Sequence, residues 1–152
     1  MNLICNLNEF NKNNIFFMET RNNMIMNGHF TKLIYSDENV TLNSIYFDFA
    51  VKYNIVKNNS NKMIIKVNVN DNRDIFSKIS FIENNILQYY STLNNISKKP
   101  VLLLKENLLS GFLKVYKQNN LTNAKIYFKI SGVWETSSEI GITYKFIDGL
   151  II

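Results

Sequence analysis

Apolar and polar side chains alternate along several stretches of the chain, which is the pattern of β-strands with one buried face. The clearest case is residues 124–148, where two alternating segments flank a polar turn. We expect a β-hairpin there, in which Gly132 permits a β-bulge that redirects Trp134. The same alternation predicts further strands at residues 30–36, 42–53, 62–69 and 112–117.

The period of the pattern changes at Asp71. From there, apolar residues recur every three or four positions, which is the spacing of an amphipathic helix. Asp71 or Asp74 can accept hydrogen bonds from the free amides of the first turn, and Pro100 follows the end of the pattern. The sequence therefore predicts one amphipathic helix at residues 72–93.

Strands, then one helix, then more strands predict a β-rich α+β fold. The order and the lengths of the elements favour an OB-like, partly open barrel of about five to seven antiparallel strands, although a different α+β barrel would have the same order. The length fits a single domain over residues 1–152. Residues 1–14 are polar and Asn-rich, and we expect a loose N-terminal arm or a short edge strand there.

Composition limits the class of protein. Hydrophobic residues make up 46% of the chain, too many for a disordered protein. The formal net charge of +5 is compatible with an anionic partner, but a bias toward Asn, Ile and Lys is also what AT-rich coding produces. Cys5 is the only cysteine, which favours a reducing compartment. With no signal peptide and no apolar run of about 18 residues, we expect no membrane association and an intracellular protein.

No set of residues with the spacing of a catalytic or metal site is present. His29 is the only histidine, so a nucleophilic triad would depend on it, and one Cys with one His is too few for zinc. The five glycines are scattered and form no phosphate loop. Most carboxylates fall at turns and helix starts, and only Asp48, outward on a central strand, lacks such a reason. We therefore expect no enzymatic activity, no metal and no cofactor.

Lysines and tyrosines recur on the polar faces of the predicted strands. Cationic groups bind phosphates and flat rings stack on bases, as a single-stranded nucleic-acid platform requires. A lysine row is also ordinary solvated surface, and Trp134 is either a buried anchor or a stacking ring. The candidate nucleic-acid-binding residues are Tyr46, Lys52, Lys62, Lys66, Lys114, Tyr116, Lys125, Tyr127, Lys129, Trp134 and Lys145.

Several segments resemble short uncharacterised proteins of DNA viruses and Polinton-like elements. The likeness runs over residues 27–148, and its distinctive part is Lys129–Glu135 followed by Gly141–Phe146; the other segments are Asn27–Phe30, Leu33–Ser36 and Leu42–Tyr46. Viruses of that kind commonly encode a single-stranded DNA-binding protein, often with an OB-fold. The resemblance therefore implies that role indirectly, and it implies no catalytic motif.

Together these observations predict a non-enzymatic protein that binds single-stranded DNA, or RNA, with little sequence preference, in viral genome replication or maintenance. In a viral setting it would act in the host cytoplasm or nucleus. The alternative is a small viral structural or assembly protein that oligomerises through its sheet. The apolar ending Leu150–Ile152 favours a homo-oligomer, because an exposed apolar terminus is often covered by a neighbouring subunit.

Overall fold

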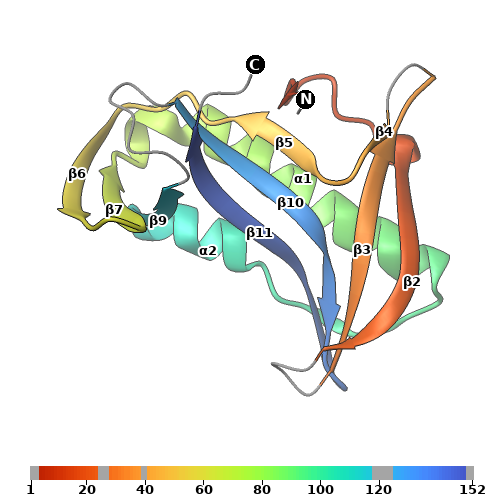
Figure 1. The fold of residues 1–152 in the computed structure, drawn as a ribbon. Coiled ribbons are helices and arrows are strands. Elements are labelled where there is room, and N and C mark those ends of the chain that lie inside the picture. Colours follow the sequence, from red (N-terminus) through yellow and green to blue (C-terminus); the bar gives the residue numbers. More distant parts are fainter. Residues whose placement is uncertain (1–3, 24–27, 39–40, 118–124, 150–152) are drawn as a thin grey trace.

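The computed structural model describes residues 4–23, 28–38, 41–117 and 125–149. It shows a large curved sheet with both α-helices behind it in the view of Figure 1. The helices are α1 (Arg73–Leu93) and α2 (Leu103–Ser110), with 3-10 helices η1 (Lys12–Asn14) and η2 (Asn70–Asn72). The strands are β1 (Ile4–Cys5), β2 (Ile15–Asn23), β3 (Gly28–Ser36), β4 (Thr41–Leu42), β5 (Ile45–Asp48), β6 (Tyr53–Asn58), β7 (Lys62–Val67), β8 (Lys99–Pro100), β9 (Phe112–Lys117), β10 (Lys125–Glu135) and β11 (Glu139–Gly149).

The β10–β11 hairpin is the centre of the sheet. The strand order is β1-β5-β10-β11-β9-β7-β6, while β3, paired with β2 and β4, joins the far end of β10. Residues 127–130 of β10 pair with β5, whereas residues 132–135 pair with β3. The register with β11 shifts between Ile130 and Gly132, so the β-bulge predicted at Gly132 is confirmed. Because of this arrangement, one edge of β10 has two different neighbouring strands.

The core lies between the sheet and α1. The helix predicted at residues 72–93 is confirmed as Arg73–Leu93, and its apolar stripe is buried. Near its start, Phe76 stacks on Phe49 with ring centroids 6.2 Å apart. Near its end, Tyr90 meets Phe17 edge-on at 4.9 Å. The helix thus packs against both halves of the sheet, and its burial leaves the opposite face of β10 and β11 pointing outward.

The second helix, α2, is one that the sequence pattern did not predict. Its N-cap residue, Leu102, has no side chain able to accept a hydrogen bond. Glu83, fully buried in α1, accepts instead from the backbone amides of Leu104 and Lys105, each at 2.9 Å. Gly111 ends the helix with φ of 77° in the left-handed region, which glycine adopts without strain. The start of α2 is therefore stabilised by a residue about 20 positions away.

The predicted fold is right in outline and needs four corrections. The chain is β-rich with a long helix, but within the described residues the sheet has eleven strands instead of the predicted five to seven. Three strand pairs are parallel, namely β1–β5, β11–β8 and β11–β9. The strand predicted at residues 42–53 ends at Asp48, and β6 begins only at Tyr53. There is also the second helix. Two-residue strands and long-range parallel pairs have no local alternation that could reveal them.

The sheet is open, because no described pairing joins the β1 end of the strand order to the β6 end. An OB-like fold therefore stays a prediction. At the N-terminus, Ile4–Cys5 of the proposed arm pairs with β5 at the edge of the sheet. Leu150–Ile152 lies outside the described residues. Neither helix in the described part of the chain has the length and apolarity needed to cross a membrane.

Candidate nucleic-acid interface

Side chains on the outward face of β5, β10, β11, β9 and β7 are rich in lysine and aromatic rings. They point outward because their neighbours in each strand, such as Phe128 and Val115, are buried in the core. Strand register places Tyr46, Lys129 and Lys145 in one row across β5, β10 and β11. It also places Lys62 opposite Tyr116, and Lys66 opposite Phe112. We call this surface the basic face, consisting of Tyr46, Lys62, Lys66, Phe112, Lys114, Tyr116, Lys129 and Lys145.

The cations of the basic face lie against its rings. The Nζ atom of Lys129 is 5.7 Å from the ring centroid of Tyr46. Two ammonium groups approach Tyr116, that of Lys145 at 5.0 Å and that of Lys114 at 5.4 Å from the ring centroid. Contacts of this kind hold a positive charge next to a π-surface. The face therefore presents phosphate-binding and base-stacking groups within a few ångströms of each other.

A pocket of about 270 Å³ opens on the basic face between β9 and β11. The two strands pair only through Phe146–Asp148 and Val115–Lys117, so their other ends diverge. Lys114, Tyr116 and Lys145 line the pocket together with Asn107 of α2 and Tyr144. The Asn107 amide donates to the Tyr144 hydroxyl, and burial raises the pKa of that hydroxyl, so it stays neutral at physiological pH.

The positive charge of this surface is not neutralised locally. None of its lysines forms an ion pair with a carboxylate in the described ranges, where ion pairs join Lys78 to Asp74 and Lys98 to Glu135. Asp48, which the sequence placed outward, is exposed at the end of β5. A row of unpaired cations on a low-dielectric protein surface attracts a polyanion. Binding there would be electrostatic in its largest part and would weaken with salt.

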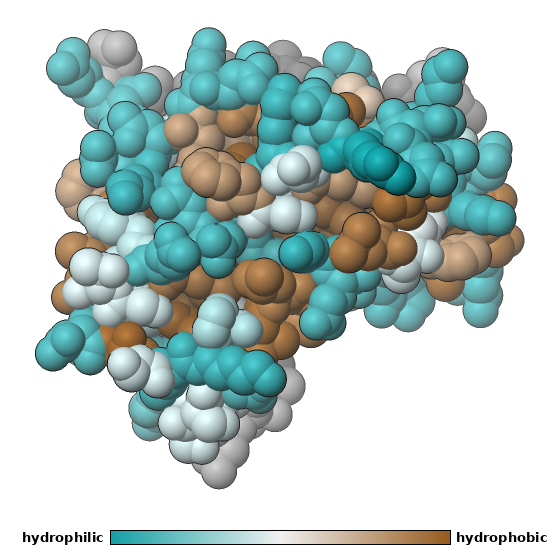
Figure 2. Space-filling view, turned by 180° about the vertical axis from the view of Figure 1, so that it is seen from behind, coloured by the Kyte–Doolittle hydropathy of each residue, from teal (hydrophilic) through white to brown (hydrophobic). Residues whose placement is uncertain are grey.

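The opposite face of the molecule has a different character. Figure 2 shows this face, where apolar side chains are exposed among polar ones. A larger cavity of about 600 Å³ lies between α1 and α2 and is lined by apolar groups such as Leu108 and by the charged residues Arg73, Asp74 and Lys105. None of the described lysine–ring contacts involves a residue that lines this cavity. Charge complementarity to a nucleic acid therefore favours the sheet face over the helical face.

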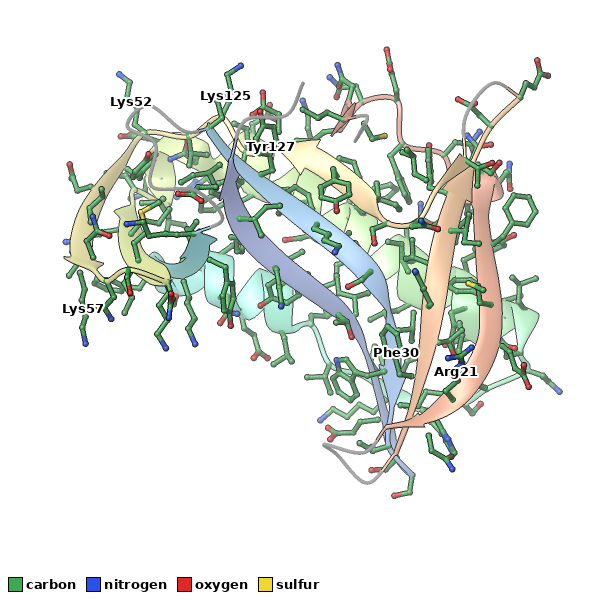
Figure 3. The ribbon with its side chains drawn as sticks, in the orientation of Figure 1. Arg21, Phe30, Lys52, Lys57, Lys125 and Tyr127 are labelled. Atoms are coloured by element: carbon green, nitrogen blue, oxygen red, sulfur yellow. The ribbon has the colours of Figure 1, made fainter. Side chains whose placement is uncertain are left out.

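Seven of the predicted site residues come together on the basic face, and four do not. Lys52 and Lys125 project from the upper edge of the sheet in Figure 3, while Lys57 projects from the lower edge of β6. Trp134 lies beyond the bulge and packs over Gly141. The seven that come together are Tyr46, Lys62, Lys66, Lys114, Tyr116, Lys129 and Lys145.

The prediction that Tyr127 faces solvent is wrong. Its exposed fraction is 4%, and its neighbours Ile126 and Phe128 are also buried. Three consecutive buried residues mean that both faces of β10 are covered at this point, because successive side chains alternate between faces. Tyr127 is therefore unavailable for stacking.

Five residues that line the pocket were not among the predicted site residues, and two of them, Leu113 and Phe146, belong to the buried core. The alternation of apolar and polar residues in β9 places Phe112 on the outward face, so the sequence pattern could have identified it as a site residue. Tyr144 falls on the core-facing side of β11 by alternation, and Asn107 belongs to the helix that was not predicted. Both reach the pocket only because β9 and β11 diverge.

A buried polar network lies at the other end of the sheet. The Tyr90 hydroxyl donates to Glu135 at 2.6 Å and is hydrogen-bonded to Thr31 at 3.0 Å. Lys98 forms an ion pair with the second oxygen of Glu135 at 3.1 Å. Burial, then the bond to Glu135, raises the pKa of Tyr90. Each of these groups has a partner, so the network joins α1 to β10 and β3.

Comparison with protein-family models, with curated proteins and with solved structures finds no match to this chain.

Proposed function

We propose that the basic face binds single-stranded nucleic acid with little sequence preference and performs no chemical reaction. The observation that carries the proposal is the approach of two lysine ammonium groups to the ring of Tyr116, beside the row formed by Tyr46, Lys129 and Lys145. Lysines would neutralise phosphates while the rings stack on bases. Every base has a π-face, so stacking of this kind tolerates any sequence.

Single-stranded DNA is the ligand that we favour, and RNA is the second choice. The resemblance to proteins of DNA viruses supports DNA and a role in viral genome replication or maintenance. An OB-like binding mode belongs to the same proposal. It is supported by the curved, open sheet, which has the helices on one side only (Figure 1), and by the cations and rings of the basic face.

Fluorescence anisotropy of a labelled oligothymidylate, measured at several salt concentrations, tests this function. Five lysines of the basic face can each neutralise one phosphate, so log K should fall with log salt concentration with a slope of up to about −3.5. Replacing Lys129 and Lys145 by Gln should weaken binding and make the slope shallower by about 1.4. The matched control replaces Lys78 and Lys105 by Gln on the helical side, which changes the net charge equally.

Three results would contradict the proposal. The first is no binding at low salt, and the second is equal affinity for duplex of the same length. The third is an equal loss in the control variant, which would mean that only net charge matters.

An assembly role is the second candidate, and the edges of the sheet favour it. Phe16 on β2 is 57% exposed and Ile55 on β6 is 51% exposed, and each of these strands pairs with a single described neighbour. Both strands also contain register shifts, which oppose edge-to-edge pairing. Size-exclusion chromatography with and without oligonucleotide separates the two functions. A stable oligomer whose elution volume does not change when oligonucleotide is added would favour the assembly role.

A further inference from the structure

Beyond the bulge of β10, two aromatic rings cover glycines on the outward face of the sheet. A Cβ built on Gly141 would lie 2.3 Å from Cζ2 and 2.4 Å from Cε2 of Trp134. A Cβ built on Gly132 would lie 2.8 Å from Cε2 and Cζ of Phe30. The rings therefore occupy the space that side chains would fill, and they pack against the strand backbone. We call Phe30 and Trp134 the aromatic platform.

The platform is half-buried and forms part of a row across four strands. Register places Arg21 of β2 opposite Phe30 of β3, Phe30 opposite Trp134 of β10, and Trp134 opposite Gly141 of β11. Figure 3 shows Arg21 and Phe30 next to each other on their strands. Because the glycines beneath the rings lack side chains, one side of each ring packs on backbone, while both residues stay partly exposed.

Exposed cations flank the platform. Arg21 ends the row on β2, and Lys32 lies two residues along β3 from Phe30, opposite Gly132. In the described part of the chain neither forms an ion pair with a carboxylate. The platform therefore has the same chemistry as the basic face, with rings for bases and cations for phosphates.

The two surfaces are continuous along β10 and β11. Lys129 pairs with Lys145, Gly132 with Thr143, and Trp134 with Gly141. Gly141 lies four positions before Lys145, which is about 13 Å along a strand. Between them, Gly132 has no side chain and is covered by the Phe30 ring, and Thr143 is small and partly exposed, so no bulky side chain separates the two surfaces. A single strand of nucleic acid bound at the basic face can therefore reach the platform.

We infer that the aromatic platform stacks bases of the same single strand, so that the bound strand follows β10 and β11 from the basic face to Phe30 and Trp134. This inference rests on the proposed function, and it adds the direction of the path and a second stacking site. It also assigns a binding role to Phe30 and Arg21.

Trp134 is the only tryptophan of the chain, so tryptophan emission, excited selectively over the eight tyrosines, reports on the platform alone. The experiment titrates the full chain with fluorescein-labelled oligothymidylate. It records anisotropy of the label and, in parallel with unlabelled oligonucleotide, emission of Trp134. We expect quenching of Trp134 with the same midpoint as the anisotropy change. Oligonucleotides too short to extend beyond the basic face should bind without quenching.

Phe30→Leu tests the second ring, because leucine keeps an apolar cover over Gly132 but has no π-face. We expect this variant to bind the long oligonucleotide more weakly by a factor of about 5 to 140. Its affinity for the short one should not change. Phe81→Leu on α1 is the control, since Phe81 is 66% exposed on the helical side. Far-UV circular dichroism confirms that both variants are folded.

The outcomes separate the inference from the function. Binding by anisotropy with unchanged Trp134 emission would overturn the platform while the proposed function stands. Absence of both signals would overturn the two together. A Trp134 spectrum that changes with protein concentration in the absence of oligonucleotide would assign the platform to a contact between chains, and would also overturn the inference.

Discussion

The clearest quantitative test of the structure is the removal of the Glu83 carboxylate of α1, which accepts hydrogen bonds from the first backbone amides of α2. Glu83 is fully buried and accepts from two backbone amides, those of Leu104 and Lys105. Glu83→Gln keeps one acceptor oxygen and turns the other into a donor that faces an amide N–H. One buried amide loses its acceptor, which should lower the free energy of unfolding by about 1 to 3 kcal/mol. Glu83→Leu leaves both amides unsatisfied and should cost about 2 to 6 kcal/mol.

The same substitution changes how stability depends on pH. Burial raises the pKa of Glu83, and this outweighs the lowering by the two amide bonds. Between the ordinary glutamate pKa and this raised value, the folded chain holds more of the proton than the unfolded chain does. The contribution of Glu83 to stability is therefore fully present below the ordinary pKa and is lost as the pH rises through the raised one. Glu83→Gln should lack this decrease.

Urea unfolding, followed by Trp134 fluorescence at several pH values, measures both effects. In thermal unfolding, a loss of 2 kcal/mol should lower Tm by about 4 to 8 °C for a chain of this size. Glu106→Gln is the control, because Glu106 is an exposed carboxylate in the first turn of the same helix, and we expect a change within about 0.5 kcal/mol. The reasoning is refuted if Glu83→Gln unfolds at the wild-type urea concentration, or if Glu106→Gln costs as much.

Three further predictions concern single side chains. Gly141→Ala places a methyl group against the ring of Trp134, so we expect a loss of about 1 to 3 kcal/mol in urea unfolding and a shifted emission spectrum; unchanged spectra would show that the ring does not cover the glycine. Tyr90→Phe removes the hydroxyl donor from a buried carboxylate and should cost about 1 to 3 kcal/mol in thermal unfolding, whereas a neutral result would argue against the buried network. Tyr116→Leu should weaken oligothymidylate binding about 5- to 140-fold in anisotropy titrations, while Tyr127→Phe should not change it because Tyr127 is buried; equal effects of the two variants would contradict the basic face as the site.

Local pattern was enough for the elements with a regular period and sufficient length. The helix at Arg73–Leu93 and the hairpin of β10 and β11 follow the predicted periods, and the bulge occurs next to Gly132, where a Cβ would lie 2.3 Å from the Thr31 carbonyl oxygen. Alternation also identified which lysines of each strand point away from the core. It did not identify α2, because the acceptor for its first amides is Glu83 on another helix.

The candidate site shows the same division. Alternation placed Lys129 and Tyr127 on one face of β10, yet one is partly accessible and the other is buried. The pattern within one strand says which side a residue takes, but not what covers that side. Likewise, no local signal indicates that Tyr116 and Lys145 meet, since that contact depends on the parallel pairing of β9 with β11.

The sequence by itself determined the periods: where the long helix, the β10–β11 hairpin and the alternating strands β3, β7 and β9 lie, and which side of each of these strands a residue takes. These follow from local sterics and from the burial of apolar side chains, which act over a few residues. Tertiary structure alone decided the open eleven-stranded sheet, the pocket between β9 and β11, and the platform of Phe30 and Trp134 over glycines. These features depend on contacts between residues far apart in the chain. The spacing of apolar and polar residues within one segment carries no information about such contacts.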